Sequence, residues 1–262
     1  MQRGYHRPVR PNHSTTRPFT RLTPNRLAPF VLTCEHAKAR LPPCTPTNPA
    51  DRAVLRTHWG WDIGAWALTR EIAALLGTGA TGGRWSRLWI DLNRPAGDPM
   101  LVRRDVEGHT LSWNARTDER EIARRYTQTH APYHREVDRE IAHRLSHGVR
   151  PFLLAIHTYA PVLEGRPRRF DAGVLYDENR REAAHLVSAL RGAGLEVRYN
   201  QPYSGKRGLM YSIDRHGRHY RLPCLELEIN QALFSRSRAA ARLARTVARG
   251  LREIELRTRG ER

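Results

Sequence analysis

Two apolar segments decide the fold class of this chain: Leu153-Leu154-Ala155-Ile156-His157-Thr158 and Leu32-Thr33-Cys34-Glu35-His36. Each segment is apolar until it reaches a histidine. Short apolar runs bounded by polar residues are typical of buried central strands. In open α/β sheets, ligands bind just beyond the carboxyl ends of such strands. We therefore expect His36 and His157 to meet at one edge of a sheet, where they can share a metal ion.

The rest of the chain alternates between strand-like runs and segments with helical periodicity. This alternation predicts one α/β domain with a mixed, mostly parallel sheet and helices on both faces. The expected strands are Phe30–Cys34, Trp85–Leu92, Phe152–Ile156, Ala172–Tyr176, Leu195–Tyr199 and Leu222–Ile229. The expected helices are one or two within Ala53–Leu76, a long one over Asp118–Ser146 interrupted near Pro132, and two more over Arg180–Leu190 and Arg236–Leu256.

Two segments of the chain are not expected to contribute to a functional site. Residues 1–27 are rich in Arg, Pro, Thr and Asn without periodicity, which predicts a disordered basic tail ahead of one folded domain over residues 28–262. Gly77, Gly79 and Gly82 match the G-x-G-x-x-G pattern, but they follow a predicted helix and precede a predicted strand. A dinucleotide site requires the reverse order, so these glycines are interpreted as a helix stop and a turn.

Composition excludes several classes of protein. The 262 residues carry a formal net charge of +19, yet lysine occurs only at Lys38 and Lys206, and the arginines are spread along the chain. No RNA-binding or zinc-finger pattern is present, so nucleic acid is not expected as the main partner. The absence of a long apolar run or an apolar leader predicts a cytoplasmic protein without a membrane span. Three scattered cysteines do not suggest a disulfide framework.

Acidic residues near the two histidines complete a candidate metal centre. Asp62 suits the start of the helix that follows it, but a carboxylate there can also join His36 and His157. Two histidines and one carboxylate leave an open coordination position on zinc. Glu35 is an alternative third ligand. The sequence predicts a site for one divalent metal ion, with zinc as the expected ion.

The segment Leu225-Glu226-Leu227-Glu228-Ile229 places two carboxylates on one face of a predicted strand. Buried carboxylates are costly without a partner. A glutamate at this position is suited to act as general base on an activated water. The other histidine pairs, His130 with His134 and His216 with His219, are expected to have surface or loop roles, because Ala131-Pro132 interrupts the first pair and the second pair lies in a polar segment.

The chain resembles the N-formylglutamate amidohydrolase family over about residues 29–235. The matching segments, in the family's order, are Cys34-Glu35-His36-Ala37, His58 to Ala65, Ser86-Arg87 with Asp91-Leu92-Asn93-Arg94-Pro95, Ala131-Pro132-Tyr133-His134, Ala155-Ile156-His157-Thr158 and Glu228-Ile229-Asn230-Gln231. The resemblance implies a zinc-carboxypeptidase-like fold and a catalytic domain that hydrolyses the amide bond of a small acidic substrate such as N-formylglutamate.

The resemblance also implies individual roles. His36, Asp62 and His157 correspond to the metal ligands, and Glu228 to the catalytic glutamate. Asn93 and Arg94 resemble a pair that binds substrate carboxylate, which agrees with the bidentate geometry of a guanidinium. The remaining candidates bind anions, contact substrate or stabilise an oxyanion: Arg87, Arg166, Arg168 and Tyr203.

Three departures from the family pattern concern the substrate more than the chemistry. The chain has Glu35 where the family tends to carry proline, and Thr158 where it carries serine. The segment Tyr203-Ser204-Gly205-Lys206 is typical of a subgroup. The alternative hypotheses are a zinc amidase or carboxypeptidase acting on a peptide or cell-wall fragment, and a basic nucleic-acid-binding protein with a vestigial site.

Overall fold

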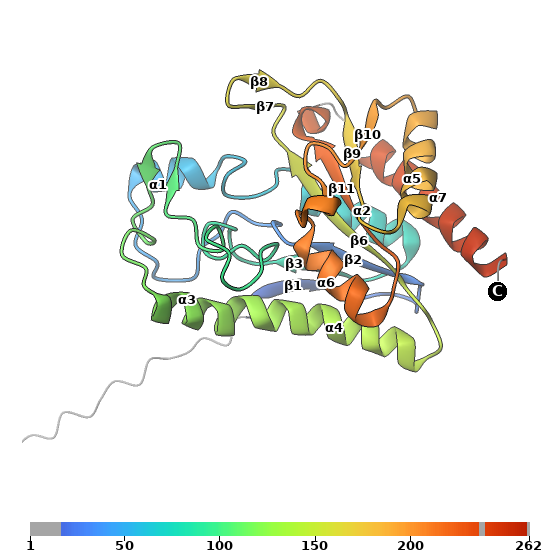
Figure 1. The fold of residues 1–262 in the computed structure, drawn as a ribbon, viewed down its shortest axis with the longest axis horizontal. Helices are drawn as coiled ribbons and strands as arrows, with labels where there is room; N and C mark the ends of the chain where they lie inside the picture. The colour runs from blue at the N-terminus through green and yellow to red at the C-terminus, as the bar shows by residue number, and fades with distance from the viewer. Residues whose placement is uncertain (1–16, 236–238, 261–262) are drawn as a thin grey trace, which may run out of the picture.

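A seven-stranded mixed sheet lies between two helical layers in the computed structural model, which describes residues 17–235 and 239–260 (Figure 1). The strand order is β1-β3-β2-β6-β11-β9-β10, and every neighbouring pair is parallel except β1–β3 and β9–β11. The predicted single-domain α/β class is therefore confirmed. The strands are β1 (Phe19–Leu22), β2 (Phe30–Cys34), β3 (Ala80–Gly83), β6 (Phe152–Tyr159), β9 (Ala172–Leu175), β10 (Val197–Tyr199) and β11 (Cys224–Asn230).

Alternating side chains of the central strands build two separate cores. Phe30 and Leu32 of β2 pack in the cluster that includes α2 (Ala65–Leu76), α5 (Arg180–Gly192) and α7 (Ala239–Gly260). Val31 of β2, together with Leu153 and Ala155 of β6, packs on the opposite face against α4 (Ala131–Ser146) and α6 (Tyr211–Tyr220). Since side chains alternate along a strand, His157 shares the face of Leu153 and Ala155.

The long helical segment is more continuous than predicted. The helix α3 (Glu119–Arg125) begins at Asp118, whose side chain accepts a hydrogen bond from the backbone of Glu121. A π-helical segment, Tyr126–His130, then leads directly into α4, and Pro132 sits at the start of that helix. The expected interruption near Pro132 is thus a local widening of the helix. Proline has no N–H to donate, and the π-helical turn directly before Pro132 is where the regular α-helical hydrogen bonding is interrupted.

The predicted strand over Trp85–Leu92 is wrong. These residues form turns, in which the Ser86 hydroxyl donates to the carbonyl of Gly60 and the Trp89 N–H donates to the carbonyl of Ser86. Their apolar side chains enter a third core under the long loops that connect β3 with α3. The strand lies earlier, at β3, where glycines are required: a Cβ on Gly83 would lie 2.0 Å from the carbonyl oxygen of Glu35.

Part of the segment that was expected to be disordered is a strand in the structure. Phe19–Leu22 forms β1, an edge strand that pairs antiparallel with β3, whereas residues 1–16 lie outside the described residues. Gly77 ends α2 in a left-handed conformation, as expected for a helix stop. His216 and His219 were expected in a polar loop, but both lie in the helix α6.

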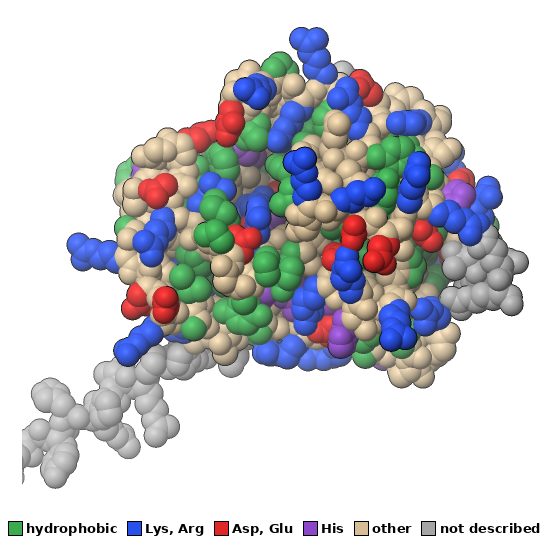
Figure 2. Space-filling view, viewed as in Figure 1, with side chains coloured by type: hydrophobic (Ala, Val, Ile, Leu, Met, Phe, Trp, Pro, Cys, Tyr) green, Lys and Arg blue, Asp and Glu red, His purple; other side chains and the backbone are tan. Residues whose placement is uncertain are grey.

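Smaller elements complete the fold. The helix α1 (Pro49–Leu55) and the hairpin β4 (Asp105–Val106) with β5 (His109–Thr110) belong to the loop region at the left of Figure 1. The hairpin β7 (Val162–Leu163) with β8 (Arg166–Pro167) follows β6. Among the described helices, none is both long and apolar enough to cross a membrane. Lysine and arginine side chains are scattered over the face shown in Figure 2 and form no single patch there.

Candidate active site

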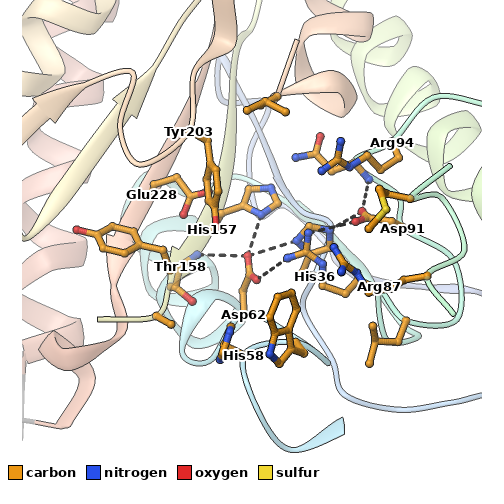
Figure 3. Close-up of a pocket in the computed structure, with 18 of the residues that line it drawn as sticks. His36, His58, Asp62, Arg87, Asp91, Arg94, His157, Thr158, Tyr203 and Glu228 are labelled. Atoms are coloured by element: carbon orange, nitrogen blue, oxygen red, sulfur yellow. Dashed lines mark hydrogen bonds and ion pairs between the residues drawn. The ribbon is translucent and has the colours of Figure 1, made fainter. Parts of the chain in front are cut away.

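His36, Asp62 and His157 converge at the carboxyl edge of the sheet (Figure 3). His157 lies within β6, His36 follows β2 by two residues, and Asp62 lies in the turn before α2. Oδ2 of Asp62 is 2.8 Å from Nδ1 of His157 and 3.4 Å from Nδ1 of His36. All three side chains are buried, and one ligand atom from each lies within 4.8 Å of the others. The sheet edge therefore brings the three predicted ligands together.

Each of the two imidazole rings bonds an outer carboxylate through Nε2, so that both Nδ1 atoms are directed at Asp62. Nε2 of His36 donates to Asp91 over 2.7 Å, and Nε2 of His157 donates to Glu35 over 2.9 Å. In a neutral ring the other nitrogen then carries a lone pair. Nδ1 of His157 is hydrogen-bonded to the Asp62 carboxylate, whereas Nδ1 of His36 has no hydrogen-bond partner. Three acceptors that converge in a buried space fit a divalent cation.

The electrostatics of His157 agree with that fit. Burial lowers the pKa of His157, but the neighbouring carboxylates, Glu226 foremost, outweigh burial and raise the pKa well above its usual range. Burial opposes ionisation of Asp62 too, yet the imidazoles of His36 and His157 hold its pKa well below the usual range. The cluster is therefore a place where positive charge is strongly favoured.

Glu35 contacts the outer side of the His157 ring, away from the shared centre. Its Oε1 accepts hydrogen bonds from the hydroxyls of Ser212, over 2.7 Å, and Tyr133, over 3.0 Å. Burial raises the pKa of Glu35, but hydrogen bonds from His157 and Ser212 outweigh burial and lower it to about 2. Every oxygen of this carboxylate is thus engaged with a donor. A carboxylate commonly accepts a hydrogen bond from the outer nitrogen of a metal-binding histidine and so orients its ring. Glu35 has this geometry relative to His157.

Arg87 bridges the two aspartates of the site. Its guanidinium lies 3.1 Å from Oδ2 of Asp91 and 3.5 Å from Oδ1 of Asp62. Burial lowers the pKa of Arg87, but the two carboxylates outweigh burial and raise it. The backbone N–H of Thr158 also donates to Asp62, over 3.3 Å. Arg87 lines the pocket and holds Asp62 in place from the side opposite His157.

Glu226 and Glu228 alternate along β11 and both line the pocket. Burial raises the pKa of Glu226 to about 7, with Glu35 adding to the rise. Burial, together with Asp62 and Glu226, also raises the pKa of Glu228 well above its usual range. Glu226 accepts a hydrogen bond from the Asn93 amide over 3.2 Å, whereas Oε2 of Glu228 is buried without a hydrogen-bond partner. Glu228 therefore has an oxygen free to exchange a proton.

A pocket of about 250 Å³ opens over these groups. The predicted substrate residues Asn93, Arg94 and Tyr203 line it, together with several residues that were not predicted. The Arg94 guanidinium lies 3.4 Å from Asp98, and nearly a third of its side chain is exposed. A cation is therefore available in the pocket for an anionic substrate. Polar lining residues to which the sequence assigned no role include His58, Asp91 and Arg103.

Arg166 is not part of this pocket. It is exposed in the hairpin β7–β8, and it is absent from the side chains that line the cavity. The structure therefore gives no support to a substrate contact by Arg166, which stays a prediction. Arg168, two residues later, instead lies over the rings of Tyr203 and Tyr159, at 5.4 and 5.6 Å from the centroids.

The groups that support the ligands are hard to find in the sequence. Asp91 lies in a segment that resembles a strand, and Tyr133 and Ser212 lie on helices far along the chain from Glu35. The sequence signal was limited to Asp91, which stands directly before the Asn93-Arg94 pair. The two other contacts depend on how α4 and α6 pack on the sheet.

An α/β sheet with a buried His–Asp–His cluster, a pocket and an unpartnered glutamate defines the class of protein as an enzyme with a hydrolase-like site. A family model described as N-formylglutamate amidohydrolase matches residues 28–235. The chain belongs to this family of amidohydrolases, and the predicted resemblance is confirmed.

Two solved structures support the assignment of the fold. A gene product from Agrobacterium tumefaciens is 28% identical, with a TM-score of 0.83, and the match covers 92% of this chain and 97% of that one. The N-formylglutamate amidohydrolase from Ralstonia eutropha JMP134 is 21% identical, with a TM-score of 0.73 and coverage of 94% and 100%. At that identity the second likeness concerns the fold. A search of curated proteins found no match.

Proposed function

We propose that the protein is a zinc-dependent amidohydrolase that cleaves the amide bond of a small N-acyl amino acid such as N-formylglutamate. The observation that carries the proposal is the convergence of two imidazole Nδ1 atoms and the Asp62 carboxylate in one buried cluster. His36, Asp62 and His157 would hold the ion, and the orientation of Glu35 supports Asp62 as the third ligand. When bound, zinc supplies Lewis acidity, which lowers the pKa of water and polarises a carbonyl group.

Glu228 is the proposed general base and acid. Its side chain lines the pocket, its Oε2 has no hydrogen-bond partner, and its raised pKa suits a group that takes a proton from water and returns it to the leaving nitrogen. Arg87 is proposed to stabilise the developing oxyanion, because its positive charge lines the same cavity.

Arg94 is proposed to bind a substrate carboxylate, with Asn93 and Tyr203 as neighbouring contacts. Arg94 is the better candidate for direct contact, since the Asn93 amide already bonds Glu226 and Ser212. The small volume of the pocket, about 250 Å³, favours an N-acyl amino acid over the peptide or cell-wall fragment of the alternative hypothesis. A cytoplasmic location and a small-molecule partner, in place of nucleic acid, remain predictions.

The test is hydrolysis of N-formylglutamate by purified protein loaded with zinc, with formate release as the readout. We expect turnover that is lost with a chelator and restored by zinc, and about one zinc ion per chain, as the single His–Asp–His centre implies. N-acetylglutamate and N-formyl dipeptides serve as competing substrates. Failure to bind zinc would contradict the metal centre, and zinc binding without amide hydrolysis would contradict the substrate class.

A further inference from the structure

Leu92, Asn93 and Arg94 belong to no strand, yet each is held by a separate hydrogen bond from the helical layer that covers the sheet. His134 donates through Nε2 to the carbonyl of Leu92 over 3.1 Å. The backbone N–H of Ser212 donates to the Asn93 side chain over 2.8 Å. His130 lies 2.9 Å from the carbonyl of Arg94, again through Nε2. The backbone around Arg94 is therefore positioned by side chains from outside its own loop.

The two histidines on this helical layer are buried, contrary to the surface or loop role expected from the sequence. His130 is 1% exposed and His134 is 3% exposed. The π-helical segment before α4 carries His130, whose ring stacks on Tyr126 at 4.5 Å and lies 4.4 Å from the ring of His134. Single π-helical turns within α-helices are frequent at functional sites. Here the wider turn ends at the residue that contacts Arg94.

The contact of His134 with the carbonyl of Leu92 fixes which ring nitrogen carries the proton. A carbonyl oxygen can only accept, so Nε2 of His134 carries the proton and Nδ1 carries a lone pair. Nε2 of His216 lies 3.0 Å from that Nδ1 and must donate to it. Nδ1 of His216 is in turn 2.7 Å from Asp138, a quarter of whose side chain is exposed. Close contacts thus lead from Asp138 at the surface through the rings of His216 and His134 to the carbonyl of Leu92.

Neutral His134 is consistent with this arrangement. Burial, with His130 and His216 close by, holds the pKa of His134 well below its usual range. The ring therefore keeps one donor and one acceptor, as the two contacts require. None of these histidines belongs to the His36–Asp62–His157 centre. His130 and His134 contact the backbone carbonyls on the two sides of Asn93.

We infer that His130 and His134, the latter supported by His216 and Asp138, are positioning residues that hold Arg94 in the geometry needed to bind a substrate carboxylate. This inference rests on the proposed function for the role of Arg94 as the group that binds a substrate carboxylate. A guanidinium binds a carboxylate through two parallel hydrogen bonds, which tolerate little displacement. Loss of the His130 contact frees the Arg94 backbone and should weaken carboxylate binding without removing any group from the metal centre.

The test is a double-mutant cycle between His130 and Arg94. Binding of glutarate, a dicarboxylate that cannot be hydrolysed, is measured by calorimetry for His130→Phe, Arg94→Ala and the double variant. We expect His130→Phe to weaken glutarate binding about tenfold, the effect of one lost hydrogen bond, and to add little once Arg94 is absent. His130→Gln keeps an N–H donor and should recover much of the affinity. His143→Ala, an exposed histidine on the same helix, is the control.

Kinetics with N-formylglutamate provide the second readout. His130→Phe should raise KM with little change in kcat, whereas a merely structural loss would lower the melting temperature equally in the Phe and Gln variants. Additive effects of His130→Phe and Arg94→Ala would overturn the inference. Asp138→Asn acts from the surface and leaves the buried rings in place; unchanged glutarate affinity in both His130→Phe and Asp138→Asn would also overturn it.

Two measurements on the unsubstituted protein, glutarate binding and hydrolysis of N-formylglutamate, distinguish a failure of this inference from a failure of the proposed function. Glutarate binding without hydrolysis of N-formylglutamate would contradict the proposed reaction, and the binding cycle would still decide the role of His130. Hydrolysis without any glutarate binding would leave the reaction standing and overturn the positioning role.

Discussion

Nε2 of His157 lies 2.9 Å from Oε2 of Glu35, on the far side of the imidazole ring from Asp62. This contact separates the two carboxylates that sequence reasoning left as alternative metal ligands. A histidine that donates one N–H to a carboxylate offers its second nitrogen to a metal. Glu35 therefore supports the site from outside, and Asp62 is the carboxylate at its centre.

Substitution of these two carboxylates should affect zinc differently. Glu35→Gln is expected to weaken zinc affinity about 10- to 100-fold, the usual effect of losing an outer partner of a ligating histidine. Asp62→Ala removes a proposed ligand and should abolish stoichiometric binding. Competition with a fluorescent zinc chelator measures both. Full zinc affinity in Asp62→Ala, together with its loss in Glu35→Gln, would reverse the two assignments.

Glu228→Gln should lower kcat about 10²- to 10⁴-fold, because proton transfer by a positioned side chain contributes that much. Zinc content should stay unchanged, since the glutamate is not a proposed ligand. The measurement is formate release at saturating substrate, with Glu164→Gln in the exposed hairpin turn as the control. A rate close to that of the parent would show that another group, such as Glu226, moves the proton.

Arg94→Ala should raise KM for N-formylglutamate about 10- to 100-fold, as expected for the loss of hydrogen bonds to a charged group. Arg166→Ala is the matched control, because Arg166 is also an arginine predicted to bind substrate but lies outside the pocket. It should leave KM unchanged. Equal effects of the two substitutions would mean that the hairpin β7–β8 folds over the pocket when substrate binds.

Asp51 should make part of the stability of the loop region depend on pH. The buried carboxylate completes the capping box of α1 with Asn48 and accepts the Ser112 hydroxyl over 2.6 Å. Burial raises the pKa of Asp51, but hydrogen bonds from Ser112 and Asn48 outweigh burial and lower it. The stabilisation is therefore fully present above the unfolded-state pKa of about 3.9 and is lost as pH falls through the lower folded-state pKa.

Asp51→Asn should accordingly lower the free energy of unfolding at pH 7 by about 1 to 3 kcal/mol. The difference from the parent should shrink as the pH is lowered below about 4, the range in which a free aspartate becomes protonated. Urea unfolding at several pH values measures both quantities, and Asp105→Asn, at an exposed position, is the control. A difference that does not change with pH would show that the carboxylate charge has no part in the cap.

Gly83→Ala should weaken zinc binding at the proposed metal centre, although Gly83 is not one of the proposed ligands. The added Cβ would lie 2.0 Å from the carbonyl oxygen of Glu35, so the backbone that leads to His36 must move. We expect weaker zinc binding together with a lower melting temperature. Gly192→Ala on α5 meets no atom within 4 Å and should be tolerated or slightly stabilising. Unchanged zinc affinity in Gly83→Ala would indicate that the loop after β2 moves independently of His36.

The strands that deliver the two histidines were predictable because their signal is local. The predicted strand Phe30–Cys34 has the same bounds as β2. The predicted strand Phe152–Ile156 begins where β6 begins, but β6 continues to Tyr159. Trp85–Leu92 carries a similar signal but forms turns, since its apolar side chains are buried in a separate core under the loops. An apolar run in the sequence indicates burial, but it does not distinguish a strand of the sheet from a buried turn.

The sequence by itself determined the α/β class, the central strands and the residue types of the site, because apolar periodicity and chain order are local properties. Only the tertiary structure decided which side chains meet. The contact of Asp62 with His157 joins residues 95 positions apart, and that of Glu35 with Ser212 joins residues 177 apart. The burial of His130 and His134 likewise depends on α4 packing against the loop of Arg94. Such contacts are set by the packing of whole elements, which no local pattern in the sequence records.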